Sequence, residues 1–580
     1  QGFFFKVGWL VKSIIKYLAR VVKRIGFSKY LGQPFSFFLP TPLNYQWNNI
    51  LKDDCGSVFV KDGKNKNILM APIYGFFEGQ LAYETTIGKN LQLRGANVKI
   101  LSCATALPAC QANISGNNIP VFNESLFKKF SCNESDLCNL CVRNLDVISK
   151  TTKIPQLKLR GFSEHGDLKV ANEFLNSRDI SFDAEILYKK INISEHAKST
   201  ALRVLLRGTL EDNLYCKAVY RRFLVAAILY IETLERAFDD FRPDSILAVH
   251  GIYLEHGVLR DLAKRDGIEI VVWGIPYRQG TLIAAVNDTY HRQYMEESNE
   301  IWSELKLSEN QIKMVQDYVG SKISGGRDIV NYHPNPILDK NKILNSLEFD
   351  SKKPLVSIFT NVLWDAQIFY SSNIFDSLLD WINETIAYYI RNPHIQLAVR
   401  IHPAESKGGF STKQPLAEEI RKVFPLLPNN IKIIEPQSDI SSIILSDASD
   451  LSVVYGSNIA LEIALRPNPL VIAGEAYLKG KGFSIDPSSK QDYFKILGDP
   501  TSVMANTKDQ VASAQRYAYH YYFKRMFSFK SVSIPISGKK LSREPKLNFN
   551  NLDKLMDGSD SGLNLMTDLL LGKTSVYYQE

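Results

Sequence analysis

The sequence predicts an α/β protein with two doubly wound domains that face one cleft. Its 580 residues are too many for a single hydrophobic core, so length alone favours at least two domains. Short apolar runs alternate with helical patterns twice, first over 67–274 and again over 354–474. Between the two series lies a polar stretch with Gly325-Gly326 and two prolines, which is typical of a linker.

The boundaries between these patterns divide the chain into five parts. We read no function in the last part, which is rich in Lys, Asn and Ser. The predicted parts are an N-terminal amphipathic segment (1–45), a first α/β domain with most of the cysteines (46–305), a linker (306–350), a second α/β domain (351–536) and a polar tail (537–580).

Composition is that of a globular protein, with 45% hydrophobic and 22% charged residues. The net charge of +8 is unevenly placed, because no Asp or Glu precedes Asp53 while seven Lys or Arg occur by Lys29. No run of about 18 uncharged apolar residues occurs, so the sequence predicts no transmembrane helix. The basic run near the start lies on a predicted helix backed by apolar residues, and we identify no basic patch interleaved with aromatic residues elsewhere, which argues against nucleic-acid binding.

Residues 3–25 predict an amphipathic helix with a basic face. Six Lys and Arg side chains fall within one third of a helical wheel, and apolar residues fill the other side. Such a helix can lie in the plane of an anionic membrane surface, where apolar burial and phosphate attraction act together. The alternative is a helix packed on the protein's own core. We favour the membrane surface because no acidic residue interrupts the basic face.

The first series begins with the apolar run 67–75, which predicts a buried strand. A loop with Glu78, a helix and Gly95 then lead to the strand NVKIL. Residues 160–240 carry mostly helical patterns. FRPDSILAVHG predicts a strand that ends at His250, followed by a helix and the strand IEIVVWG.

The second series begins with the strand PLVSIFT at 354–360, a helix, and the strands IQLAV and IKIIE. A helix then leads into Leu451–Gly474, which reads as an apolar strand, a Gly-Ser-Asn turn, a short helix and a second apolar strand. The helix DQVASAQRYAYHYYFKRMF closes the series. The carboxyl ends of parallel strands share one edge, which is where ligands of such sheets bind.

Polar side chains follow three strands of the second series. Thr360-Asn361 ends the first strand, and Arg400 and His402 end the second. A guanidinium and an imidazole at a strand end suit phosphate groups, although a lone histidine there is more often structural. Because all three strand ends share an edge, their coincidence points to a ligand site.

The Gly-Ser-Asn turn is the third of these strand ends. Gly456, Ser457 and Asn458 open a helix, where amides and a hydroxyl can receive a phosphate. Glu462, one turn further on, can reach a ribose hydroxyl. The alternative is an ordinary strand-turn-helix in which Ser or Asn only caps the helix.

Several segments resemble bacterial capsule-polysaccharide biosynthesis glycosyltransferases. FTNVLWDA, RIHPAE and YGSNIALEIALRPNPLVIAGEAYLKGKGF are similar to the carboxyl-terminal domain of that family, and HGIYLEHGVLRDLAKRDGIEIVVW, RQGT and DTYHR to its amino-terminal half. The resemblance covers about 67–527 and is patchy over 145–240. It implies a GT-B fold of two Rossmann-like domains, a nucleotide-sugar donor held mainly by the second domain, and no catalytic metal or other catalytic cofactor.

The resemblance also implies roles for individual residues. Metal-free transfer needs hydrogen-bond donors on the departing phosphate. Carried over position by position, the residues that contact the nucleotide or its phosphates are Arg400, His402, Ser457, Asn458 and Glu462, with Thr360, Asn361 and Asp365 close to the donor.

Inverting transfer also needs a general base for the acceptor hydroxyl. Glu78 and His250, at strand ends of the first domain, are the candidate bases, and Glu255, His256 and His291 are weaker ones. Each has a structural alternative. A histidine can order a loop by hydrogen bonding, and Glu78 can be a helix-start carboxylate favoured by the helix dipole.

Six of the seven cysteines lie before residue 142, and the odd count in a long chain favours a reducing compartment. Cys103, Cys110, Cys138 and Cys141 form two close pairs that could hold a structural zinc ion tetrahedrally. Separate reduced thiols explain the spacing equally well, and an iron–sulfur cluster is a weaker option.

Three functions remain open from the sequence. The first is a cytoplasmic glycosyltransferase, peripheral on the inner face of the plasma membrane, that transfers sugar from a nucleotide sugar to a glycan or lipid-linked glycan acceptor of a capsule, O-antigen or related surface glycan. The second is a non-hydrolysing sugar-nucleotide epimerase, which has no need of the basic helix. The third is a non-catalytic polysaccharide assembly or export factor, against which the intact Arg400, His402, Ser457 and Glu462 argue.

Overall fold

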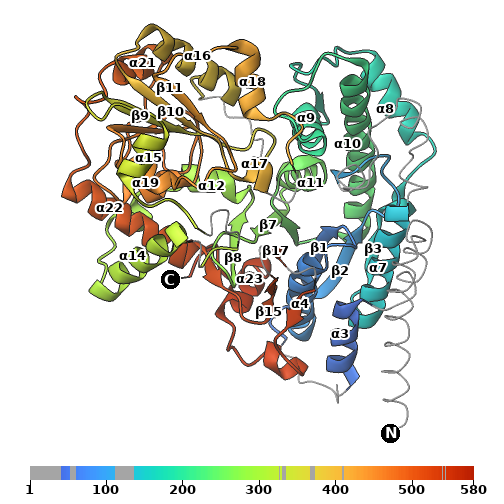
Figure 1. Ribbon diagram of the computed structural model, residues 1–580. Coiled ribbons are helices and arrows are strands. Elements are labelled where there is room, and N and C mark those ends of the chain that lie inside the picture. Colours follow the sequence, from blue (N-terminus) through green and yellow to red (C-terminus); the bar gives the residue numbers. More distant parts are fainter. Residues whose placement is uncertain are drawn as a thin grey trace, which may run out of the picture.

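Two sheets, each with helices packed against it, organise the protein (Figure 1). The helix predicted at 3–25 lies outside the described residues. None of the helices that are described is long and apolar enough to cross a membrane. The computed structural model describes residues 41–52, 61–111, 136–324, 327–329, 335–365, 373–407, 411–537, 540–541 and 544–579.

The first sheet has the strand order β14-β8-β7-β6-β1-β2-β3 in the described part of the chain. Strands β3, β2, β1, β6 and β7 are parallel, and β8 and β14 extend the sheet antiparallel. From β3 to β7 the chain order is 3-2-1-4-5, the doubly wound order, which reverses between β1 and β6. The strands are β1 Asn67–Ile73, β2 Asn97–Ser102, β3 Gln156–Lys158, β6 Ser245–Val249, β7 Glu269–Gly274, β8 Thr281–Val286 and β14 Phe527–Ser528.

Both faces of the first sheet are buried, which explains why its strands are continuous apolar runs. Alternate residues of β1 belong to different cores: Ile68 and Met70 pack with α4 and α23, whereas Leu69 and Ala71 pack with α10 and α11. The helices of this part are α3 Pro42–Lys52, α4 Glu78–Leu93, α7 Asp136–Thr152, η3 Leu159–Phe162, α8 Asp167–Asn176, α9 Ile193–Leu205, α10 Leu214–Phe241, α11 Tyr253–Arg265, α12 Tyr290–Glu296 and α13 Glu300–Ser303.

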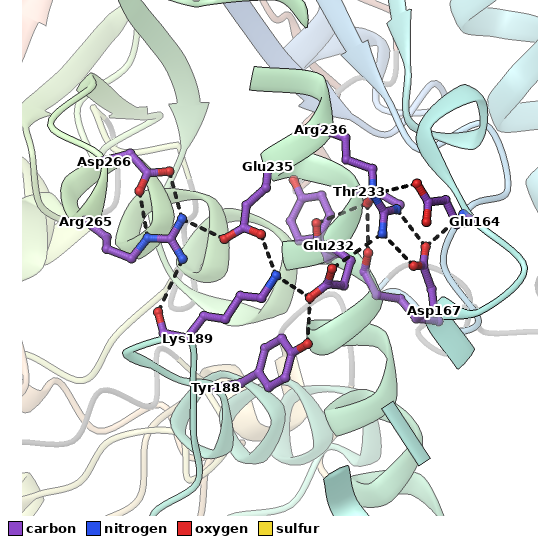
Figure 2. Close-up of polar contacts among 12 residues, drawn as sticks. Glu164, Asp167, Tyr188, Lys189, Glu232, Thr233, Glu235, Arg236, Arg265 and Asp266 are labelled. Atoms are coloured by element: carbon purple, nitrogen blue, oxygen red, sulfur yellow. Dashed lines mark hydrogen bonds and ion pairs between the residues drawn. The ribbon is translucent and has the colours of Figure 1, made fainter. Parts of the chain in front are cut away.

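Charged side chains fasten α8, α11 and the hairpin of β4 (Leu187–Tyr188) and β5 (Ile191–Asn192) to the long helix α10 (Figure 2). Arg236 on α10 donates to both carboxylate oxygens of Asp167 at 2.7 and 2.9 Å. Lys189, in the hairpin turn, reaches Glu235 at 2.6 Å, and Arg265 of α11 reaches the same carboxylate at 2.8 Å. These pairs are partly exposed, so they orient the helices more than they stabilise the fold.

The second sheet is entirely parallel over its described residues, with the order β11-β10-β9-β12-β13. This is again 3-2-1-4-5, with the reversal between β9 and β12. The strands are β9 Leu355–Phe359, β10 Gln396–Arg400, β11 Ile431–Ile434, β12 Leu451–Val454 and β13 Leu470–Ile472, and the helices are α16 Leu378–Arg391, α17 Ala404–Lys407, α18 Leu416–Val423, α19 Ser442–Asp447, α20 Ile459–Ala464 and α21 Lys490–Gly498.

The chain crosses between the sheets twice. The predicted linker is largely helical, with α14 (Glu309–Ser324) and α15 (Lys340–Ser346), and α14 packs on α22 (Lys508–Tyr519). A π-helical segment, η4 (His520–Arg525), follows α22 and returns the chain to β14 at the edge of the first sheet. Two Rossmann-like domains joined in this way form the GT-B architecture that the resemblance implies.

The stretch from 537 to 579 is not a separate polar tail where it is described. Its helix α23 (Ser561–Leu570) packs on α4, β6 and β7 of the first domain and buries Leu563, Met566 and Leu569 there. Spaced apolar residues among the polar ones account for this packing. The short elements of this end are β15 Val532–Ser533, β16 Ile536–Ser537, β17 Lys540–Leu541, β18 Lys546–Leu547 and η5 Leu552–Leu555.

Candidate functional site

Three strand ends of the second sheet are joined by hydrogen bonds at its order reversal. The backbone N–H of His402, after β10, donates to Oγ1 of Thr360, after β9, at 3.1 Å. The N–H of Gly456, after β12, donates to Oδ1 of Asn361 at 3.3 Å. The predicted convergence of these ends on one edge is therefore confirmed. In doubly wound sheets the crevice at such a reversal binds the ligand.

The imidazole of His402 is held in a defined tautomer. Its Nδ1 accepts the N–H of Ala404 at 3.1 Å, which places the proton of the neutral ring on Nε2. Burial lowers the pKa of His402 to about 4, while Asp365 opposes the shift and Arg400 adds to it. At neutral pH the ring is uncharged, and Nε2–H can donate a hydrogen bond.

Arg400 occupies a more structural position than the sequence predicts. The side chain is 1% exposed, and its guanidinium donates to the carbonyl oxygens of Glu435 at 2.6 Å and Ser438 at 3.0 Å. These bonds fix the chain after β11. The position of Arg400 thus supports the sheet edge, and this geometry gives no support to direct phosphate contact.

The remaining predicted donor-side residues surround the start of α20. Ser457 is 8% exposed, and Asn458 donates its side-chain amide to the hydroxyl of Tyr277, which follows β7 of the first domain. Glu462 is buried and paired with Lys322 of α14 at 3.3 Å. The two domains therefore meet at this turn.

The order reversal of the first sheet lies between β1 and β6, and its loops are conformationally strained. Ile73 ends β1 with φ 59°, and His250 and Tyr253 follow β6 with φ 58° and 65°. Left-handed backbone is costly for non-glycine residues, most of all for β-branched ones. Such strain is concentrated at functional sites, so these loops form a candidate active-site edge.

His250 is the candidate base that stands at this strained turn. Its Nδ1 is hydrogen bonded to the hydroxyl of Tyr290. Burial lowers the pKa of His250 to about 4, Arg203 lowers it further and Asp365 opposes the shift. If Nδ1–H donates to the Tyr290 oxygen, Nε2 carries the lone pair that a general base needs.

Asp365 and Arg203 link the two edges. Arg203, at the end of α9, donates to the Asp365 carboxylate after β9 at 2.7 Å, and its guanidinium lies 4.6 Å from the ring of Trp364. Asp365 acts on the pKa of both His250 and His402, so the two imidazoles approach it from opposite domains. The two carboxyl edges therefore face each other.

Glu78, the other candidate base, is engaged by a different helix. Glu78 is the first residue of α4, burial raises its pKa, and Thr41 and Leu43 at the start of α3 oppose that shift. A carboxylate in the first turn of a helix is stabilised by the helix dipole. This arrangement matches the structural alternative for Glu78 rather than the base.

The three weaker candidate bases are Glu255, His256 and His291 of the first domain. Glu255 is 0% exposed and accepts the Gln111 N–H at 2.7 Å, and burial raises its pKa. Burial lowers the pKa of His256 and of His291 to about 3 in each case. A buried carboxyl that accepts from the backbone orders a loop, so Glu255 is better explained as structural.

None of the four cysteines of the predicted zinc site forms a disulfide bond. Burial raises the pKa of Cys103 to about 11 and that of Cys141 to about 12, so both are protonated at neutral pH. Cys141 also accepts the Gly75 N–H at 3.0 Å. Among the described residues, no group of three or more His, Cys, Asp or Glu side chains is arranged to hold a metal ion. Cys103, Cys138 and Cys141 nevertheless lie close enough to act on one another's pKa, and the zinc site stays a prediction.

Sequence reasoning missed the partners that come from the opposite domain or from the linker. Arg203 lies in a helical pattern with other basic residues, Tyr277 in a loop and Lys322 in the linker, and no local signal distinguishes any of them. Their partners are far along the chain, as for Arg203 and Asp365, which are 162 residues apart.

Comparisons with known proteins find fold resemblance only. No family model and no curated protein matches the chain. Among solved structures, KpsC of Thermosulfurimonas dismutans, a beta Kdo 2,4 transferase, is 10% identical, with 57% of this chain and 88% of that chain covered and a TM-score of 0.30.

Two further solved structures cover more of the chain. The spinosyn rhamnosyltransferase SpnG, complexed with spinosyn aglycone, is 10% identical over 79% of this chain and 96% of its own, with a TM-score of 0.24. The Neisseria meningitidis UDP-GlcNAc 2-epimerase, bound to UDP-GlcNAc, is 10% identical over 79% and 98%, with a TM-score of 0.25. Transferases and epimerases both occur among these structures, so the matches do not choose between the two activities.

Proposed function

We propose that the protein is a glycosyltransferase that moves a sugar from a nucleotide-sugar donor to a glycan or lipid-linked glycan acceptor. The observation that carries the proposal is that the order reversals of the two sheets, each between parallel strands, oppose each other across the Arg203–Asp365 pair. A transfer between two bound substrates needs a site with two such sides.

The second domain supplies the donor side in this proposal. The amides and hydroxyl of the Gly456-Ser457-Asn458 turn and the neutral Nε2–H of His402 donate to the diphosphate as negative charge develops on it. Uncharged donors fixed in place stabilise a departing phosphate without the cost of reorganising solvent. Glu462 accepts hydrogen bonds from the ribose hydroxyls.

The first domain supplies the base. His250 takes the proton of the acceptor hydroxyl while the acceptor oxygen bonds to the anomeric carbon. The bond from that carbon to the diphosphate oxygen breaks, and its electron pair leaves with the nucleotide. Attack opposite to the leaving group inverts the configuration, so the proposal includes an inverting mechanism.

The acceptor and the place of action belong to the same proposal. A basic amphipathic segment at 3–25 favours work at the anionic inner face of the plasma membrane, where a lipid-linked glycan is presented. The growing capsule, O-antigen or related bacterial surface glycan is the acceptor class that we propose.

The experiment is a thermal-shift screen of the full chain with UDP-, GDP-, CMP- and dTDP-sugars, followed by product analysis with and without a membrane-derived acceptor. A true donor at 100 times its Kd stabilises the protein by about 2.7 kcal/mol. His402→Ala should remove most of that shift, and His394→Ala, an exposed histidine of the same domain, should leave it intact.

Two outcomes would contradict the proposal. Absence of any shift with all four donor classes removes the nucleotide-sugar site. An epimerised nucleotide sugar formed without acceptor assigns the epimerase function instead.

A further inference from the structure

The pairing of Lys322 with Glu462 is unusual because it joins a linker helix to the start of the predicted donor site. Lys322 is near the end of α14, and its ammonium lies 3.3 Å from Oε1 of Glu462. Both side chains are largely buried, with 8% and 11% of each exposed. A buried ion pair needs a reason, since it rarely adds stability over an apolar contact.

Lys322 is held independently of Glu462. Its Nζ donates to Oδ2 of Asp328 at 2.7 Å, and the other oxygen of Asp328 accepts the Tyr318 hydroxyl at 2.5 Å. The ammonium also lies 5.3 to 5.5 Å from the ring centroids of Tyr318, Tyr522 and Tyr277. One carboxylate and three ring faces thus fix the cation in place.

The segment that carries Asp328 is itself anchored to the first domain. The N–H of Ile329 donates to the Tyr277 carbonyl at 2.9 Å, and the N–H of Gln279 to the Arg327 carbonyl at 3.3 Å. Lys322 therefore presents a fixed positive charge to Glu462 from outside the second domain.

We propose that Lys322 is a positioning residue for the nucleotide: it keeps the Glu462 carboxylate ionised and oriented so that the carboxylate accepts hydrogen bonds from the 2′- and 3′-hydroxyls of the ribose. This inference rests on the proposed function. The inference adds a role for the linker helix α14 to the proposed function. It also specifies that the donor is a ribonucleotide.

The electrostatics of Glu462 agree with this role. Burial raises its pKa, Lys322 opposes that shift by charge and by hydrogen bonding, Asp328 adds to it, and Arg466 opposes it. The hydroxyls of Tyr477 and Tyr522 also face this carboxylate. Without Lys322, a buried carboxyl beside Asp328 would take up a proton and accept fewer hydrogen bonds from a diol.

The test compares nucleotide affinity over pH 6 to 8.5 in the full chain and its variants by calorimetry. The probes are UDP, GDP and CMP, each with its 2′-deoxy analogue. The wild type should bind the ribonucleotide more tightly than the deoxy form at every pH in this range. For Lys322→Met the ribonucleotide affinity should fall about tenfold for each unit by which the Glu462 pKa exceeds the assay pH, and recover as pH rises.

Matched variants separate positioning from loss of structure. Lys322→Arg should keep the pH-independent nucleotide affinity of the wild type. Glu462→Gln should abolish the preference for ribose over deoxyribose at all pH values. Lys481→Met removes another buried lysine, which donates to the Glu297 carbonyl at 2.7 Å, and should leave the pH profile flat.

Each adverse outcome has one meaning. If the wild type binds none of these nucleotides and shows no thermal shift with any of the four donor classes, the proposed function fails. Binding of a dTDP-sugar alone would overturn this inference and leave the proposed function standing. If it binds them and Lys322→Met keeps the wild-type pH profile and ribose preference, the inference fails alone. Preference of the wild type for the 2′-deoxy form also overturns it.

Discussion

The carboxyl edges of the two sheets hold their loops in different ways. At the second edge, side chains accept backbone N–H groups of neighbouring strand ends, as Thr360 does for His402 and Asn361 for Gly456. Of the residues described between 351 and 526, no non-glycine residue has a positive φ. At the first edge, Ile73, His250 and others lie in the left-handed region.

The difference assigns different tasks to the two edges. Hydrogen bonds between strand ends make a rigid, unstrained frame, which suits binding of a fixed group such as a diphosphate. Left-handed backbone at a non-glycine residue costs about 1–3 kcal/mol and persists only where the surroundings impose it. We infer that the left-handed backbone at the first edge orients particular side chains, among them that of His250.

The largest expected effect comes from replacing His250. Asparagine tolerates the left-handed conformation but has no imidazole, so His250→Asn should lower the transfer rate about 10²- to 10⁴-fold with little change in stability. Because the pKa of His250 is about 4, wild-type activity limited by this base should be flat above pH 5.5 and fall as the pH drops towards 4. Steady-state rates over pH and thermal melting measure both.

A matched control sharpens this prediction. His394→Asn changes an exposed histidine of the second domain and should leave rate and melting temperature as they are. If His250→Asn keeps its transfer rate and gains stability, His250 is not the base and the strain at the first edge has another cause.

The sequence predicted most of the strands and the polar residues at their carboxyl ends. It predicted few of the contacts between the two domains. Apolar runs located β1, β2, β6, β7 and all strands of the second sheet, and parallel pairing then required Thr360, His402 and Gly456 to meet. The short strand β3 and the antiparallel strand β8 were not predicted. Both are defined by neighbours rather than by their own pattern.

Roles that depend on distant partners were beyond sequence patterns. The Arg400 guanidinium donates to carbonyl groups after β11, and residue spacing gives no sign of these partners. The pairing of Lys322 with Glu462 depends on how the linker helix packs. Side-chain direction and domain contact decide such roles, and neither follows from local periodicity.

A smaller effect is expected at the second edge from Thr360→Val. The substitution keeps the shape of the side chain but leaves the His402 N–H without its acceptor, which should lower the free energy of unfolding by about 1–3 kcal/mol. Urea denaturation measures this change. Thr360→Ser retains the hydroxyl and should lose much less.

If the proposed donor site is correct, nucleotide affinity should fall together with the stability in Thr360→Val, because the same hydrogen bond positions His402. If Thr360→Val is destabilised but binds nucleotide as tightly as the wild type, the hydrogen bond from His402 to Thr360 supports the fold and is not needed for nucleotide binding.

The smallest effect is expected at the contact between the edges. Arg203 and Asp365 are 24% and 56% exposed, so their 2.7 Å ion pair should contribute at most about 1 kcal/mol. A double-mutant cycle with Arg203→Met and Asp365→Asn, followed by thermal or urea unfolding, measures the coupling. The pair Lys490–Glu384, at 2.6 Å and similarly exposed within one domain, serves as the control. Screening by 1 M salt should remove the coupling in both pairs.

A coupling of about 3 kcal/mol that survives salt would contradict this prediction. The two edges would then be held rigidly together, and the rigid frame would include both domains.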